Sequence, residues 1–325
     1  MSTPFLRRVA LASVLAAAAA CASSAGNGAS GSPTPTATPT GTATPTATPS
    51  PTGTPQGTSC VTDVSAGDHT FACDGINYDV HVPAACAAGG CPLVLDVHGL
   101  TMDAAMEDAN TGMRALGDAH GYVVVQPNAN PAPPLSSWNT SDYDKVFAFL
   151  GEAREAWAIP ATKIHMTGFS QGGLMTFAFL CAHADVFASV AAGSVGGIGC
   201  SFSGSDMPSR EIPVLQMHGT QDALISYSQV GIPQRDDMLA GWHMDGGTVI
   251  AGDANFTRTR YTNANGTVVE FISHDYTSPP AVLHGHCFPG STDPGGAPGQ
   301  LFSFACTGPN AFDWGEEAMA FFEAH

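Results

Sequence analysis

The chain has 325 residues, of which 28 are acidic and only 10 are Lys or Arg, and its formal net charge is -18. Nucleic-acid binding depends on basic side chains that neutralise phosphates, so this balance argues against a nucleic-acid partner. An anionic polymer is an equally poor ligand. Charged residues make up only 12% of the chain and glycine occurs 37 times, which indicates a well-buried core with many tight turns.

The amino terminus has the pattern of an export signal. Arg7 and Arg8 precede an apolar run over residues 9–20 that is too short to span a bilayer as a stable helix. Two cleavage modes stay open: ordinary cleavage near residues 22–25, or a lipoprotein site at which Cys21 would carry a lipid anchor. We expect a signal peptide over residues 1–21 and a bacterial protein that is secreted or held on the outer surface.

Residues 32–55 repeat Thr, Pro and Ala without a charged or large apolar side chain. Such a segment cannot bury a core and forms a stiff, extended spacer. The expected organisation is a disordered linker over residues 22–59 followed by one folded domain over residues 60–325.

Eight of the nine cysteines follow Cys21. An even number in an exported chain indicates disulfides, and no spacing is typical of a zinc site, so we expect no metal. The sequence leaves the connectivity open, but pairing neighbours along the chain gives Cys60–Cys73, Cys86–Cys91, Cys181–Cys200 and Cys287–Cys306.

After Cys60, short apolar runs alternate with helical stretches, which predicts a mostly parallel sheet with crossover helices. The expected strands are residues 76–82, 93–97, 122–126, 164–167, 187–192, 214–217 and 268–272. The expected helices are residues 103–120, 142–157, 171–182 and 311–322. No linker interrupts this series, so the pattern indicates a single α/β domain.

The segment GFSQGG around Ser170 matches the G-x-S-x-G nucleophile elbow, in which glycines let a strand turn sharply into a helix and expose the serine hydroxyl. The motif is weak in a glycine-rich chain, because small residues also serve ordinary turns. Its context is right, since an expected strand runs into it and an expected helix runs out of it. We therefore expect Ser170 to be a nucleophile.

A serine nucleophile needs an imidazole to take its proton and a carboxylate to orient that imidazole, and in this fold they follow in the order Ser, Asp or Glu, His. Asp222 comes just after the expected strand 214–217, at the strand end where such sheets carry functional groups. His286 lies after the last strand, in LHGHCFPG, and is the expected base. The open alternatives are Asp206, Asp236 and Asp237 for the acid, and His274 and His284 for the base.

Acyl transfer also needs donors for the developing oxyanion. The backbone N–H of Gln171 follows the nucleophile, and that of Leu100 follows His98-Gly99 at the end of a strand. We expect His98 to be a structural turn residue. Trp138, in the proline-rich loop before the next helix, either lines a substrate pocket or is a half-buried surface aromatic.

These segments together resemble the extracellular polyhydroxybutyrate depolymerase and feruloyl esterase family over nearly all of residues 60–325: HGLTMDA, Trp138-Asn139, GFSQGG, AAGS between Cys181 and Cys200, HGTQD, GHCFPG and FDWGEEAMAFFEAH. The resemblance implies an α/β-hydrolase that cleaves carboxylic esters without a cofactor. It implies a triad of Ser170, Asp222 and His286, with Leu100 and Gln171 at the oxyanion positions. The family usually has Trp where Phe288 stands, which makes Phe288 a candidate for substrate binding beside Trp138.

The expected function is hydrolysis of carboxylic esters through an acyl-enzyme, on a polyhydroxyalkanoate-type polyester or its oligomers. Feruloyl or acetyl groups on plant polysaccharide are the alternative substrates, because fold and triad do not encode the pocket. A serine peptidase and a non-catalytic binding protein on the same scaffold are the competing classes. No cofactor and no obligate protein partner is expected.

Overall fold

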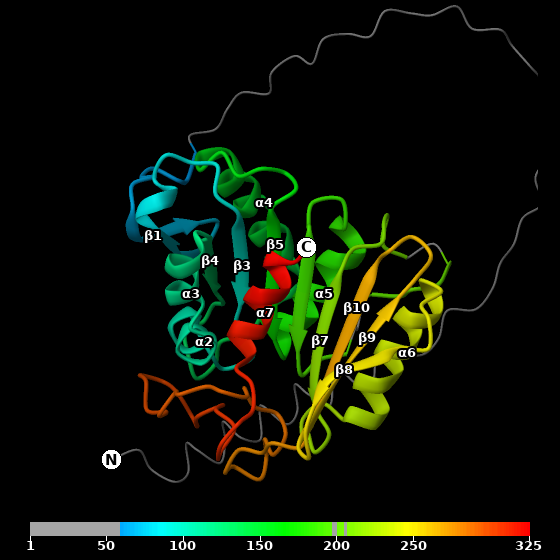
Figure 1. The fold of residues 1–325 in the computed structure, drawn as a ribbon. Helices are drawn as coiled ribbons and strands as arrows, with labels where there is room; N and C mark the ends of the chain where they lie inside the picture. Colours follow the sequence, from blue (N-terminus) through cyan, green and yellow to red (C-terminus); the bar gives the residue numbers. More distant parts are fainter. Residues whose placement is uncertain (1–58, 197–199, 205–206) are drawn as a thin grey trace, which may run out of the picture.

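The computed structural model describes residues 59–196, 200–204 and 207–325. The expected signal peptide, Cys21 and nearly all of the expected linker lie outside the described residues. The described part is built on a 10-stranded sheet in the order β1-β2-β4-β3-β5-β6-β7-β10-β9-β8 (Figure 1). Within it, no helix has the length and apolar character needed to cross a membrane.

The centre of the sheet is parallel, and its strands are buried on both faces. In sheet order these strands are β4 (Val123–Asn128), β3 (Leu93–Val97), β5 (Ile164–Phe169), β6 (Ser189–Gly193), β7 (Val214–Gly219) and β10 (Val268–His274). Continuous apolar runs are typical of such doubly covered strands, which is why the sequence indicated them. Their carboxyl ends share one edge of the sheet, and this edge carries the candidate site.

Both flanks of the sheet are antiparallel. β1 (Gly67–Cys73) and β2 (Ile76–Val82) form a hairpin beside β4, while β9 (Phe256–Thr262) and β8 (Thr248–Gly252) extend the sheet beyond β10. Mixed sheets of this kind are common among large α/β domains.

Helices cover both faces of the sheet. In Figure 1, α2 (Ala104–Thr111), α3 (Met113–His120) and α7 (Trp314–Glu323) lie in front of the strands, and their apolar residues form one core cluster. The opposite face packs against α4 (Thr140–Ala156), α5 (Gln171–His183) and, through Met238, α6 (Ile232–Gly241), which form the second cluster. Two short helices, η1 (Ala84–Cys86) and η3 (Tyr227–Gly231), complete the fold. This confirms the predicted α/β-hydrolase architecture of a mostly parallel sheet flanked by helices.

One expected element is wrong in detail. The helix expected over residues 103–120 is broken at Gly112, whose φ of 63° is left-handed and ends α2. The chain restarts as α3, because the Asp108 carboxylate accepts a hydrogen bond from the Arg114 N–H (2.9 Å). The sequence analysis also missed β1, β8, β9 and α6.

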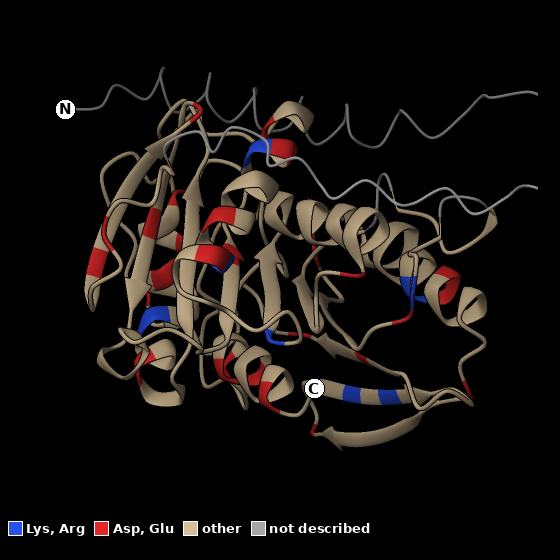
Figure 2. Ribbon diagram, turned by 90° about the horizontal axis from the view of Figure 1, so that it is seen from above, with Lys and Arg blue, Asp and Glu red and all other residues tan. Residues whose placement is uncertain are grey.

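Four disulfides join the cysteine pairs that the sequence analysis named: Cys60–Cys73, Cys86–Cys91, Cys181–Cys200 and Cys287–Cys306. The first two lie near the β1–β2 edge, the third joins the end of α5 to the chain after β6, and the fourth closes a loop directly after His286. Acidic residues predominate along the ribbon, and the few basic residues are scattered (Figure 2).

Candidate active site

Ser170 occupies the turn between β5 and α5. Its backbone has φ 54° and ψ -114°, a conformation that costs a non-glycine residue about 1–3 kcal/mol and persists only where the surrounding fold enforces it. The Ser170 N–H donates to the Gly193 carbonyl (2.9 Å) and its own carbonyl accepts from Leu174 (3.0 Å), so both sides of the turn are fixed. Such strain is characteristic of a serine held out at a strand-to-helix elbow.

The flanking glycines are required because the backbone passes too close for a side chain. A Cβ on Gly172 would lie 1.8 Å from the Val97 carbonyl oxygen, and one on Gly168 would lie 2.5 Å from the Gly172 carbonyl. The first turn of α5 therefore rests directly on the end of β3. The glycines that the sequence motif singled out serve this close approach.

Asp222 and His286 form a buried hydrogen-bonded pair at the same edge of the sheet. Asp222 follows β7, and its Oδ2 lies 2.7 Å from His286 Nδ1. Its other oxygen accepts from the backbone N–H groups of Leu224 (2.9 Å) and Ile225 (2.7 Å). Burial disfavours the charged carboxylate, but the His286 imidazole, His218 and the Ile225 N–H together outweigh burial and keep the pKa of Asp222 below its usual value.

The loops that carry Asp222 and His286 are bonded to each other through their backbones. The Gly285 N–H donates to Gln221 (3.1 Å) and the Ala223 N–H donates to Leu283 (3.2 Å). The contact is so close that a Cβ on Gly285 would lie 2.7 Å from the Asp222 nitrogen. The backbone hydrogen bonds between the two loops thus hold Asp222 and His286 in a fixed relative position.

The His286 ring packs against Phe169, the residue that precedes the nucleophile. The ring of Phe169, the residue before Ser170, lies 4.8 Å from the His286 ring, centroid to centroid. Phe288 stacks on the same Phe169 ring at 3.9 Å and is completely buried. Phe288 therefore lies behind Phe169 and supports it from the core, and no part of it is open to a ligand in this structure.

On the other side of Ser170, the segment after β3 approaches the nucleophile closely. A Cβ on Gly99 would lie 3.3 Å from Ser170 Cβ, so the backbone leading to Leu100 passes against the serine. The neighbouring His98 is fully buried, with Nε2 accepting from the Ala129 N–H (3.0 Å) and Nδ1 on the Gly99 carbonyl (2.7 Å). Burial lowers the pKa of His98 to about 4, which fits a neutral structural residue.

The side chain of Gln171 fastens the proline-rich loop to the elbow. Its Oε1 accepts from the Trp138 N–H (2.9 Å), and its Nε2 donates to the Trp138 carbonyl (3.1 Å). The Trp138 indole in turn donates to the His98 carbonyl (2.9 Å) and is only 4% exposed. Trp138 is thus buried and links the elbow to the loop after β3 through hydrogen bonds, and little of its ring is exposed.

None of the described rival acids and bases shares the side-chain bond between Asp222 and His286, although His284 forms a backbone bridge with Asp222. His284 is exposed with φ 48°, and burial lowers the pKa of His274 to about 4. The Asp236 side chain pairs with Arg235 (2.6 Å), and that of Asp237 accepts from the Phe202 N–H (3.1 Å). Asp206 lies outside the described residues.

Sequence reasoning gave His218 no role at the site. Its Nε2 donates to the Ile225 carbonyl (2.8 Å) and also lies 3.5 Å from Asp222 Oδ2. The signal was present in HGTQD, because His218 closes the strand and Asp222 follows four positions later. In the described ranges, no group of three or more His, Cys, Asp or Glu side chains could hold a metal ion.

Comparison with known proteins gives partial matches. A family model described as Phospholipase/Carboxylesterase matches residues 142–232, which include Ser170 and Asp222. The bifunctional acetylxylan esterase/xylanase XynS20E of Neocallimastix patriciarum is 30% identical over 160 residues, covering 48% of this chain and 23% of that protein. Poly(3-hydroxyalkanoate) depolymerase C of Paucimonas lemoignei is 28% identical over 134 residues, covering 38% of this chain and 32% of its own.

Each match spans less than half of the relative's length, so the relatives' full activities do not transfer directly. Among solved structures, an acetyl xylan esterase from Aspergillus awamori matches with a TM-score of 0.51 at 14% identity, over 66% of this chain and 91% of that enzyme. At that identity the match speaks for the fold alone. The matches bear out the predicted resemblance: the chain has the α/β-hydrolase fold and is similar in sequence to an acetylxylan esterase/xylanase and a poly(3-hydroxyalkanoate) depolymerase.

Proposed function

We propose that residues 60–325 form one catalytic domain, a serine carboxylic ester hydrolase that works through an acyl-enzyme. The observation that carries the proposal is the 2.7 Å bond between Asp222 and His286 at the sheet edge where Ser170 stands in its strained elbow. A buried acid–base pair at the same sheet edge as a half-buried, strained serine fits the arrangement that nucleophilic acyl transfer requires.

Each group has a defined part in the proposed cycle. His286 Nδ1–H donates a hydrogen bond to Asp222, which leaves Nε2 of the ring free to take the hydroxyl proton of Ser170. Ser170 then attacks the ester carbonyl, and the backbone N–H groups of Leu100 and Gln171 stabilise the oxyanion. His286 returns the proton to the leaving alcohol, and water releases the acyl group by the same route.

Two groups support this machinery from behind. Phe288 holds Phe169 against His286, and Trp138 ties the elbow to the segment that carries Leu100. We assign both aromatic residues a positioning part beside the substrate site.

For the substrate, we propose a polyhydroxyalkanoate-type polyester or its oligomers, supported by the similarity to a poly(3-hydroxyalkanoate) depolymerase. An acylated plant polysaccharide is the second candidate, supported by the similarity to an acetylxylan esterase. The four disulfides support export to an oxidising compartment. Whether Cys21 anchors the exported protein through a lipid belongs to the same proposal.

The decisive experiment is labelling with a fluorophosphonate probe, with Ser170→Ala as the control. We expect an adduct on Ser170 in the wild type and none in the variant. Absence of an adduct from the folded wild type would leave only a non-catalytic binding protein. Faster release of amines from peptides than of alcohols from esters would instead indicate a peptidase. Parallel assays on polyhydroxybutyrate film, methyl ferulate and acetylated xylan then rank the esters.

A further inference from the structure

A polar cavity of about 340 Å³ opens at the carboxyl end of β4. Its volume falls in the range of pockets that hold small ligands, roughly 300–1,000 Å³. It lies between the β1–β2 turn, the end of β4 and the start of α2. Its lining residues are mostly polar: Thr70, Gly75, Asn77, Asp79, Asp103, Asn128, Ala129, Asn130, Ala132 and Pro133.

The cavity shares the edge of the sheet that carries Ser170. β4 ends at Asn128, and because β2 is antiparallel to β4, the start of β2 at Asn77 pairs with that end. In the sheet order β4-β3-β5, two strand spacings separate the end of β4 from the elbow, which is about 10 Å. Asp103 lies three residues after Leu100, so the oxyanion segment leads directly into the cavity wall.

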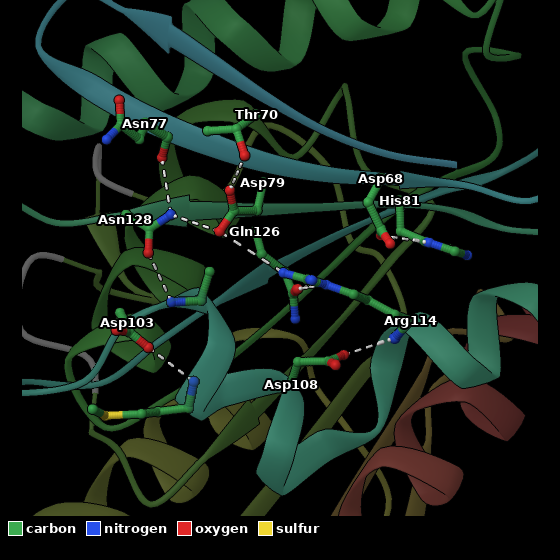
Figure 3. Close-up of polar contacts among 12 residues, drawn as sticks. Asp68, Thr70, Asn77, Asp79, His81, Asp103, Asp108, Arg114, Gln126 and Asn128 are labelled. Atoms are coloured by element: carbon green, nitrogen blue, oxygen red, sulfur yellow. Dashed lines mark hydrogen bonds and ion pairs between the residues drawn. The ribbon is translucent and has the colours of Figure 1, made fainter. Parts of the chain in front are cut away.

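The polar groups of the cavity are held in place before any ligand arrives. Asp79 accepts from the Thr70 hydroxyl (2.7 Å) and from the Asn128 amide (3.1 Å), and Asn128 accepts from the Ala104 N–H (2.9 Å) (Figure 3). The Asp103 carboxylate caps α2 through the Met106 N–H (2.9 Å). Fixed donors and acceptors bind a ligand without losing conformational freedom, so this network is preorganised.

The chemistry of the lining residues limits the classes of ligand that fit the cavity. Among the described lining residues there is no Lys or Arg and there are two carboxylates, of which Asp79 lies 3.8 Å from Arg114 behind the wall, so an anion is disfavoured. An apolar ligand would displace water from Asp79, Asp103 and the amides, and it could not replace the hydrogen bonds that the water makes. Carboxylates accept from hydroxyl groups, and amides both donate and accept. A neutral ligand with several hydroxyl groups therefore satisfies the lining best.

We propose that this cavity binds a sugar residue of the glycan chain whose ester is cleaved at Ser170. The inference rests on the proposed ester hydrolase and deepens its second candidate substrate, the acylated polysaccharide, by giving the polymer a binding site. The cavity extends outward along the sheet edge from the end of β4, which lies two strand spacings, about 10 Å, from the elbow, so the alcohol side of the ester would extend across the Leu100 segment. The catalytic domain thereby carries its own polymer-binding site.

Calorimetric titration of the full chain tests this inference with sugars that contain no ester. Xylohexaose, cellohexaose and mannohexaose are the probes, and a linear 3-hydroxybutyrate trimer represents the polyester. We expect at least one of the hexaoses to bind and the trimer not to bind. Asp79→Asn should weaken sugar binding at least tenfold, on the order of the loss of one hydrogen bond to a charged group.

Two further variants keep the test specific. Asn77→Ala removes an exposed lining amide with little risk to folding, and it should also weaken sugar binding. Glu316→Gln is the matched control, because Glu316 lines a separate cavity of about 330 Å³ on the α2–α3 side, and it should leave binding unchanged.

The outcomes separate the two proposals. Binding of none of the hexaoses, binding of the trimer instead, or equal weakening by Glu316→Gln would overturn the sugar site. Turnover of p-nitrophenyl acetate, whose alcohol is not a sugar, reports on the ester hydrolase itself. If the wild-type protein turns over p-nitrophenyl acetate but binds none of the hexaoses, only the cavity proposal is refuted. If the wild-type protein binds sugar but shows no turnover, the hydrolase proposal is refuted.

Discussion

The disulfide Cys287–Cys306 should matter for catalysis as well as for stability, and the chain contains its own control. Cys181–Cys200 closes a loop of the same sequence separation, 19 residues. The two perturbations are the double variants Cys287→Ala/Cys306→Ala and Cys181→Ala/Cys200→Ala. In the chain-entropy model each should lower the free energy of unfolding by about 3 kcal/mol at 25 °C.

The two variants should differ in turnover. Cys287 directly follows His286, and its loop is held by hydrogen bonds between Phe288 and Phe304 (2.8 Å) and between Cys306 and Phe288 (3.0 Å). Without the disulfide, the His286 backbone loses its covalent link to Cys306 and keeps hydrogen bonds such as that from its own N–H to Leu283 (2.9 Å). A misplacement of about 1 Å costs roughly 100-fold in rate, so a loss of kcat between tenfold and 100-fold is expected. The Cys181 variant changes the far end of α5 and should keep its kcat.

Urea denaturation without reductant measures the stability loss, and p-nitrophenyl acetate turnover at 25 °C, well inside the folded baseline, measures kcat. Equal stability losses with a selective loss of kcat in the Cys287 variant would support the reasoning. Full kcat in a Cys287 variant that has lost the predicted stability would refute it, and so would an equal loss of kcat in the control.

Three further predictions concern single residues. His286→Ala should lower turnover by several orders of magnitude, because triad members act as a unit, whereas His284→Ala should not; the reverse pattern in kcat would assign the base to His284. Gly172→Ala should abolish fluorophosphonate labelling, since its Cβ would lie 1.8 Å from the Val97 carbonyl oxygen. Gly151→Ala in α4, whose Cβ would meet no atom within 4 Å, should raise the free energy of unfolding by about 1 kcal/mol, as measured by urea denaturation. Burial raises the pKa of Asp96 to about 7, so the folded state keeps a proton that the unfolded chain releases near 3.8. The stability from this proton is complete below pH 3.8 and is lost as the pH rises through about 7. As the pH rises from about 4 to about 8, the free energy of unfolding of Asp96→Asn should therefore rise by about 4 kcal/mol relative to that of the wild type. A difference in urea midpoint that does not change with pH would contradict this.

The central sheet could be predicted from the sequence because its strands are buried on both faces and therefore apolar without interruption. The antiparallel β8–β9 edge could not. β8 is exposed along its whole length, and β9 places Arg258 and Arg260 where a strand usually places apolar residues. Both arginines bond to the carboxylate of Glu270 on β10 (2.5 and 2.6 Å), so the strand is explained by a partner that lies next to it only in the fold.

The pairing of Asp222 with His286 could be predicted because chain order and strand ends determine it in this fold. The parts of Trp138 and Phe288 could not be, because an aromatic residue in a loop has the same sequence signature whether it faces a ligand or the core. His218 was missed for a related reason: its contact with Asp222 depends on the loop turning back over the end of β7, which the letters HGTQD alone do not state.

The backbone bonds between the Asp222 and His286 loops make acid and base a single mechanical body, while Ser170 belongs to another built from β5 and α5. A substitution in either loop should therefore disturb Asp222 and His286 together, and substitutions in both should be strongly non-additive. We therefore expect the distance between Ser170 and the Asp222–His286 pair to vary more easily than the hydrogen bond within the pair. An acyl group of different width would then be accommodated by a change in this distance, and the bond between Asp222 and His286 would be kept.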